Sequence, residues 1–106
     1  MFHKPTWLAL GLLCALPLAS LAAGNPQAGA KKNSMCVGCH GIDGYKTAFP
    51  SVYHVPKIGG QHADYLVAAL QAYKTGTRKH PTMTGLAAQL SDQDIADLAA
   101  YYAAKR

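Results

Sequence analysis

Apolar residues recur at helical spacing in the middle of the chain. Between His62 and Thr75 they fall at positions i, i+3, i+4 and i+7, as Leu66, Ala69, Leu70 and Tyr73. Such a stripe predicts an amphipathic helix that buries one face. Gly76 follows at the position where a glycine commonly terminates a helix. The segment from His62 to Thr75 is therefore predicted to be helical.

A second apolar stripe predicts a helix from Asp92 to about Ala104. Its members are Ile95, Leu98, Ala99 and Tyr102. Ser91 precedes the stripe and Asp94 follows three residues later, which resembles a capping box with Asp in place of the usual Glu. Acidic residues at the start and basic residues at the end of this segment also suit the helix dipole.

A third helix is expected near the start of the globular part, from Pro26 to Cys39. Pro26 suits the first turn of a helix, where its missing N–H is not needed. Ala28, Gly29 and Ala30 give one side of this helix very small side chains. A thin face allows another helix to pack closely, so we expect the first and last helices to cross near Gly29.

Two segments rich in glycine, proline and polar residues separate these helices, at residues 41–61 and 76–90. Neither has a strand pattern. The predicted class is therefore all-α, with about three main helices. Long loops in a small domain usually wrap around or bind something.

The N-terminal segment has the composition of a secretory signal peptide. Lys4 precedes an almost wholly apolar run that ends in small residues. We expect residues 1–22 to be cleaved after Ala22, with Ala23 as the alternative site, leaving a domain of residues 23–106 in the periplasm. The alternatives are an uncleaved membrane anchor and a lipid-anchored Cys14, but the apolar run is shorter than the roughly 20 residues that span a bilayer.

The net charge of the chain is +5. Nucleic-acid binding is disfavoured because export is predicted and no dense run of Lys and Arg occurs. A basic face for docking acidic protein partners is the more economical interpretation, and a solvated surface without a partner is the alternative. Four lysines are candidates for such a face: Lys31, Lys32, Lys57 and Lys79.

The segment "CVGCH" carries the chemistry. Cys36, Cys39 and His40 have the Cys-x-x-Cys-His spacing of a c-type haem attachment site. On a helical turn the two thiols lie on one side, where each can form a thioether with a haem vinyl group, and the next residue can reach the iron. A structural disulfide is a poor explanation, because so small a loop stabilises little.

Two other classes of site use similar residues. A thioredoxin-like dithiol needs a βαβ environment, and no strand pattern is present. A structural zinc site needs four ligands, and no second Cys-x-x-Cys or paired histidine spacing supplies them. Haem c is therefore favoured over both.

The sixth position of the iron decides the function. Met83 is the preferred ligand, since it lies more than forty residues from His40, far enough for the chain to reach the opposite face. His80 is the alternative. Met35 is expected to fill the core, because it precedes Cys36 on the attachment side, and His54 and His62 are expected at the surface or in loops.

The sequence resembles a class I cytochrome c. The resemblance runs from "NPQAGAKK" through "CVGCHG", "PKIGGQHADYLVAAL" and "PTM" to "LSDQDIADLAAYYAAKR". It is strongest to one half of the two-haem bacterial cytochromes of the c-four type and to their single-haem relatives, with Gly59 where these have Ala. The resemblance implies a class I cytochrome c fold around one covalently bound haem, in which the carbonyl of Pro56 accepts a hydrogen bond from His40.

The function implied is that of a periplasmic carrier of single electrons, with iron held by His40 and Met83, and no enzymatic activity. Its partners would be redox proteins, including acidic or membrane-bound respiratory complexes, and a homodimer fits the likeness to half of a two-haem protein. Two alternatives stay open: a haem-bearing subunit of a larger oxidoreductase, and a small haem peroxidase or gas sensor with an accessible sixth position.

Overall fold

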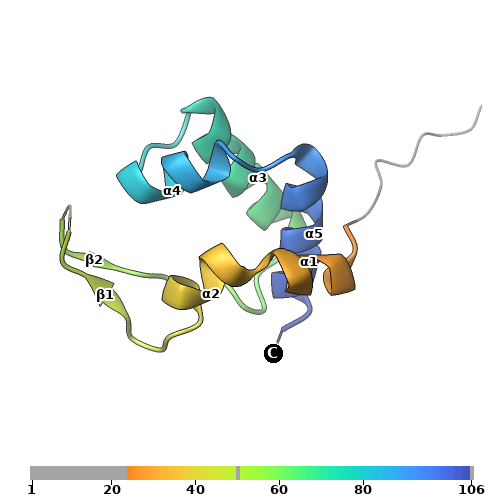
Figure 1. The fold of residues 1–106 in the computed structure, drawn as a ribbon, viewed down its shortest axis with the longest axis horizontal. Coiled ribbons are helices and arrows are strands. Elements are labelled where there is room, and N and C mark those ends of the chain that lie inside the picture. The colour runs from red at the N-terminus through yellow and green to blue at the C-terminus, as the bar shows by residue number, and fades with distance from the viewer. Residues whose placement is uncertain (1–23, 50, 106) are drawn as a thin grey trace, which may run out of the picture.

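The computed structural model describes residues 24–49 and 51–105. The signal peptide predicted for residues 1–22 lies outside this range. The described residues form five helices and two short strands: α1 (Pro26–Lys32), α2 (Ser34–His40), β1 (Lys46–Thr47), β2 (Tyr53–His54), α3 (Ala63–Thr75), α4 (Pro81–Ala87) and α5 (Asp92–Ala103). In Figure 1, α1 crosses α5 at one side of the molecule, while α4 and the β1–β2 hairpin extend toward the other side.

The two long helices, α3 and α5, form where the apolar stripes predict them. Their contact buries Leu66, Ala99 and Tyr102 in one cluster. The predicted capping box is confirmed, because Asp94 N donates to Ser91 Oγ at 3.1 Å and Ser91 N donates to Asp94 Oδ2 at 3.0 Å. Gly76 ends α3 with φ +82°, a left-handed conformation that favours glycine.

The crossing of α1 and α5 at Gly29 is also confirmed. A Cβ atom added to Gly29 would lie 2.1 Å from the carbonyl oxygen of Asp97 and 2.7 Å from Cβ of Tyr101. These separations are far shorter than a van der Waals contact, so only glycine allows the two helices to come this close.

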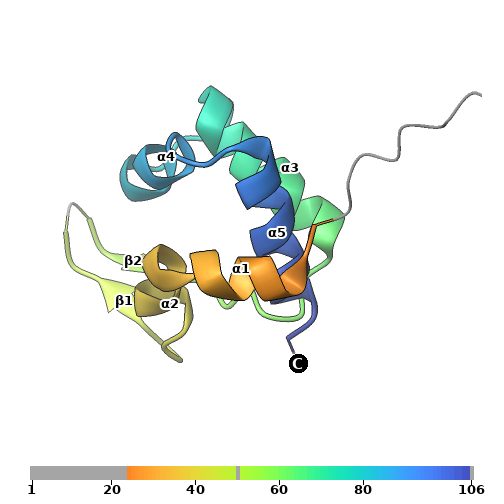
Figure 2. The ribbon, with the colours of Figure 1, turned by 45° about the vertical axis from the view of Figure 1, so that its right-hand side comes forward.

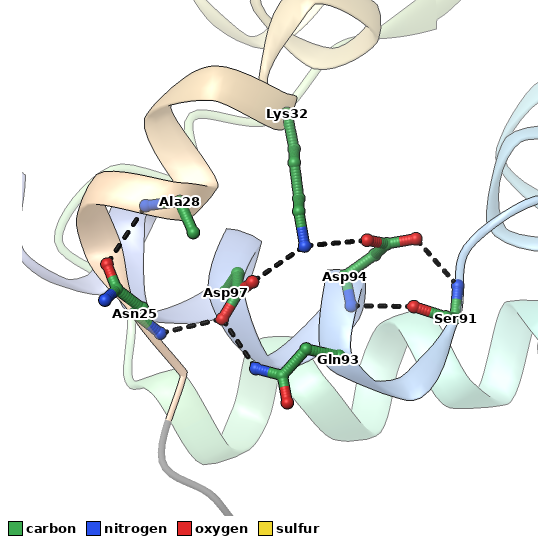
Figure 3. Close-up of polar contacts among 7 residues, drawn as sticks. All are labelled: Asn25, Ala28, Lys32, Ser91, Gln93, Asp94 and Asp97. Carbon is green, nitrogen blue, oxygen red and sulfur yellow. Dashed lines mark hydrogen bonds and ion pairs between the residues drawn. The ribbon is translucent and has the colours of Figure 1, made fainter.

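A polar cluster fastens the same crossing (Figure 3). Lys32 reaches from α1 to α5, where Nζ lies 2.8 Å from Asp94 Oδ1 and 2.7 Å from Asp97 Oδ2. The Asp97 carboxylate also accepts hydrogen bonds from the backbone N–H of Asn25 and from Gln93 Nε2, both at 2.8 Å. The side chain of Asp97 is only 4% exposed, so these donors compensate for its burial.

The prediction of one helix from Pro26 to Cys39 was wrong at Asn33, which separates α1 from α2. Asn33 is buried, and its side chain bonds to α5: it accepts from the hydroxyl of Tyr102, and Nδ2 lies 3.4 Å from the hydroxyl oxygen of Tyr101. Its carbonyl oxygen accepts from the N–H of Cys36 at 3.0 Å. The chain thus turns where a polar side chain finds partners near the opposite end of the sequence.

The segments predicted as loops contain additional structure. β1 and β2 pair antiparallel, with Lys46 opposite His54 and Thr47 opposite Tyr53, although no strand was predicted there. Strands of two residues are too short to show an alternating pattern. The seven-residue helix α4 was likewise expected as a loop. Within the described part of the chain, no helix is long and apolar enough to cross a membrane.

Candidate functional site

A cavity of about 470 Å³ opens among α2, the hairpin, α3, α4 and α5. Its volume falls within the range of about 300–1,000 Å³ that is typical of ligand and cofactor sites. Most of its wall is apolar and comes from both long helices and from α4, through residues that include Leu66, Leu70, Leu86, Ala87, Leu98 and Ala99. Such a wall suits a large apolar group.

Cys36, Cys39 and His40 all line this cavity from α2. The two cysteines are unpaired and half-buried, and they lie three positions apart on one helix. Burial raises the pKa of the Cys36 thiol. The structure therefore brings together the three residues that the sequence motif singled out.

The imidazole of His40 is held by Pro56. His40 Nδ1 lies 2.7 Å from the carbonyl oxygen of Pro56, which also lines the cavity. A carbonyl can only accept a hydrogen bond, so Nδ1 is the donor and Nε2 is the ring nitrogen left for another partner. A histidine that binds a metal through Nε2 needs this arrangement, with its ring fixed by the other nitrogen.

Met83 lines the same cavity from α4. In Figures 1 and 2, α4 and α2 lie apart, with the cross-packed α1 and α5 to one side of them. The donors contributed by the two helices therefore reach the cavity from different parts of the fold. Met83 lies in a short helix and not in the flexible loop expected from the sequence.

The other candidates for an axial ligand have different surroundings. Met35 was expected to fill the core, but this was wrong, because it is 46% exposed at the edge of the cavity. His54 and His62 are exposed, as expected, although His54 also lines the cavity. His80 lines the cavity, and its Nδ1 accepts a hydrogen bond from the backbone N–H of Met83.

The side chains that line the cavity distinguish between a zinc site, a redox dithiol and a haem c site. Within residues 24–49 and 51–105, no group of three or more His, Cys, Asp or Glu side chains is arranged so that it could hold a metal ion, whereas a structural zinc site needs four ligands. A thioredoxin-like dithiol needs a βαβ unit, and the described chain has only two strands, each of two residues. Two thiols, one oriented imidazole and a roomy apolar cavity fit haem c.

Two contacts near the cavity were not anticipated from the sequence. The hydroxyl of Tyr102 donates to Asn33, and burial raises the pKa of Tyr102 so that the proton stays on the hydroxyl. The ring of Tyr53 packs edge-on against His80. Neither pair has a local sequence signal, because its members come from distant segments.

Comparison with known proteins agrees with this site. Residues 26–103 match the family model described as cytochrome c. The chain is 43% identical over 101 residues to cytochrome c4 of Pseudomonas aeruginosa, covering 93% of this chain and 48% of that protein. It is 45% identical over 86 residues to cytochrome c-554(548) of Halomonas halodenitrificans, covering 78% of this chain and 99% of that protein.

A third relative is named the thiosulfate dehydrogenase electron acceptor of Thiomonas intermedia. It is 33% identical over 93 residues, covering 88% of this chain and 39% of that protein. The chain spans about half the length of the cytochromes c4 that it matches, and almost all of cytochrome c-554(548). With one Cys-x-x-Cys-His motif and a cavity around it, the chain belongs to the cytochrome c family and binds haem c through Cys36 and Cys39.

Proposed function

We propose that this protein is a single-haem electron carrier whose iron is ligated by His40 and Met83. One observation carries the proposal: both residues line one cavity, from α2 and α4, next to the two cysteines that attach the haem. With both axial donors supplied by the chain, no iron position remains for a substrate. Exchange of single electrons is then the chemistry left to the site.

Haem c supplies a couple between ferric and ferrous iron. The residues of the chain determine how easily that couple operates. Pro56 fixes the ring of His40, and the thioether of Met83 is a soft donor that favours the ferrous state. The apolar wall also favours the oxidation state with the smaller net charge. The soft thioether therefore raises the reduction potential.

We further propose that the carrier works in the periplasm, exported by a signal peptide of residues 1–22. Support comes from the order of a basic start, an apolar run and small residues in that segment. Mass spectrometry of protein expressed with its leader tests this. A mature N-terminus at Ala23 or Gly24 is expected, and a retained leader would contradict export with cleavage.

The partners are proposed to be redox proteins. The name of the Thiomonas relative, an electron acceptor of a dehydrogenase, supports this class of partner. Two of the candidate docking lysines form ion pairs that partly neutralise their charge. Lys32 pairs with Asp94 and Asp97. Lys57 Nζ lies 3.0 Å from Asp43 Oδ1. Lys31 and Lys79 are exposed and remain the better candidates for docking.

The docking proposal predicts a salt effect. Electron-transfer rates with an acidic redox protein should fall as the ionic strength rises, because added salt screens exposed charges over about 10 Å at 0.1 M. Rates that do not depend on salt would contradict a basic docking face.

The same preparation, examined by size-exclusion chromatography, separates a monomer from a homodimer and from a subunit that copurifies with a larger oxidoreductase.

Absorption spectra test the ligation directly. The ferric protein should show the weak long-wavelength band of methionine-ligated haem c, and Met83→Ala should lose it while keeping covalent haem. Met35→Ala is the matched control, since that side chain lies at the edge of the cavity on the attachment helix, and it should keep the band. A wild-type protein without the band, whose ferrous form binds carbon monoxide readily, would favour a peroxidase or gas sensor.

A further inference from the structure

The helix that carries Met83 is capped by a histidine. His80 precedes α4 in an extended conformation, and its Nδ1 accepts the backbone N–H of Met83 at 3.3 Å. The backbone N–H of His80 donates to Thr84 Oγ1 at 3.2 Å, and its carbonyl accepts from the backbone N–H of Thr84 at 2.8 Å. The first turn of α4 is therefore closed by three hydrogen bonds that involve His80.

This cap matters because α4 has little else to hold it. Helices much shorter than about 12 residues are not stable alone in water, and α4 has only seven. Its first turn has no acidic residue to interact with the helix dipole, and Ala87 is its only fully buried residue. The position of Met83 thus depends on the cap more than it would in a long, well-packed helix.

The imidazole of His80 is itself held from the hairpin. The rings of Tyr53 and His80 are 4.8 Å apart between centroids, at an interplanar angle of 75°. This edge-to-face arrangement is a favourable one for aromatic pairs. Both side chains also line the cavity. Tyr53 therefore limits the rotation of the ring whose Nδ1 caps α4.

The short segment 53–56 reaches both sides of the site. Tyr53 contacts His80 beside Met83, and three residues later the carbonyl of Pro56 accepts the hydrogen bond from His40. Between them, the backbone N–H of Val55 donates to the carbonyl of Tyr45 at 2.9 Å. One hairpin strand and its extension thus support the surroundings of both axial donors.

We propose that His80 is a positioning residue for Met83, and that Tyr53 holds the His80 imidazole in its capping orientation. The inference rests on the proposed ligation of the iron by Met83. His80 acts through the backbone of α4 and is not itself a ligand. Without the cap, the first turn of α4 opens and Met83 leaves the iron more readily.

Competition with exogenous imidazole measures directly how readily Met83 leaves the iron. Titration of the ferric holoprotein with imidazole, followed through loss of the methionine-dependent band, gives the ease with which Met83 is displaced. His80→Ala should bind imidazole about fivefold more tightly, which corresponds to the loss of about 1 kcal/mol for a helix N-cap. His80→Asn, which restores a side-chain acceptor at the cap, should return the imidazole affinity to within about twofold of the wild type.

The chain supplies a matched control in His62. It precedes α3 at the same capping position, but its side chain makes no capping hydrogen bond. His62→Ala should leave the imidazole affinity unchanged. An equal change in His80→Ala and His62→Ala, or no change in His80→Ala, would overturn the proposal.

A pair of tyrosine variants keeps the test decisive if His80→Ala does not fold. Tyr53→Phe keeps the aromatic ring and should match the wild type, whereas Tyr53→Ala should bind imidazole more tightly. Equal affinities in these two variants would overturn the role of Tyr53. A wild-type protein that lacks the methionine band would overturn the ligation by Met83 and this inference with it, whereas a wild type with the band and an unaltered His80→Ala would overturn the inference alone.

Discussion

The two sides of the molecule are built in different ways. At the crossing of α1 and α5, close backbone contact at Gly29 and the buried carboxylate of Asp97 join residues that are 65 or more positions apart in the sequence. Around α4 and the hairpin, the elements are short and the contacts are few, and Phe49 and Val52 are 88% and 65% exposed. The first region holds the chain together, whereas the second carries Met83, the proposed ligand, and we expect it to open without unfolding the rest.

The largest loss of stability is expected from a substitution at the crossing of α1 and α5. Gly29→Val would place side-chain atoms inside the space already occupied by the carbonyl of Asp97. Overpacking a tight site costs about 1–3 kcal/mol and occasionally more, and here the obstacle is backbone, so we expect a loss of at least about 3 kcal/mol. Urea unfolding followed by circular dichroism measures this. A stability close to that of the wild type would mean that α1 is not packed as described.

Hydrogen exchange compares the two regions in one molecule. Amides of α5 should exchange only through global unfolding, whereas those of α4 should exchange through local opening, at least about tenfold faster. The reason is that α5 buries five residues and α4 buries one. Native-state exchange at a series of low denaturant concentrations resolves the two classes. Equal protection in both helices would show that the haem makes the fold uniformly rigid.

Acid should lower the stability of the protein by weakening the contacts between α1 and α5. The ion pair with Lys32, followed by hydrogen bonds from Ser91, lowers the pKa of Asp94 from 3.8 to about 2. The backbone N–H of Asn25, followed by Lys32, lowers the pKa of Asp97. Since a lowered pKa means that the unfolded state binds the proton more tightly, this stability is present above about pH 4 and is lost as the pH falls toward about 2.

Unfolding midpoints in urea between about pH 2 and pH 6 check this acid dependence. Asp94→Asn should lose less stability across that range than the wild type, because one of the two carboxylates no longer titrates. Asp43→Asn is the control, since Asp43 is exposed and, among the described residues, forms an ion pair with Lys57 alone. An acid dependence identical in the wild type and in Asp94→Asn would show that the ion pair with Lys32 has no role in it.

The smallest change in stability is expected from a substitution in α4. A Cβ added to Gly85 meets nothing within 4 Å, and Gly85 does not line the cavity. Gly85→Ala should therefore raise the stability of α4 by about 0.5–1 kcal/mol through helix propensity. Slower local exchange of the α4 amides, with little change in global stability, is the expected result. A loss of the methionine band would mean that this face of α4 meets the haem.

The sequence was sufficient for features that have a local cause. The stripe that ends at Tyr73, the capping box at Ser91 and the spacing of Cys36 and Cys39 each act over a few residues, and each has its expected structure. The small residues around Gly29 also predicted the close crossing, since a missing side chain is visible in the sequence.

Features with a distant cause were not predicted. The chain turns at Asn33 because the partner of its side chain is Tyr102, 69 residues away. The strands β1 and β2 are too short to show an alternating pattern. The residue that caps α4 is His80, and histidine is not among the usual capping residues. Met35 was assigned to the core because it precedes Cys36 on the attachment side, but its position on α2 leaves it exposed at the edge of the cavity.

The crossing of the first and last helices has a consequence for how the chain matures. Asn25 and Asp97, which meet at this crossing, are 72 residues apart, so α1 cannot complete its contacts until Asp97 has been made. The two thiols of α2 lie just after α1 and therefore become available long before the fold can close around them. The order of these segments therefore leaves both thiols accessible on an open chain until α5 has been made.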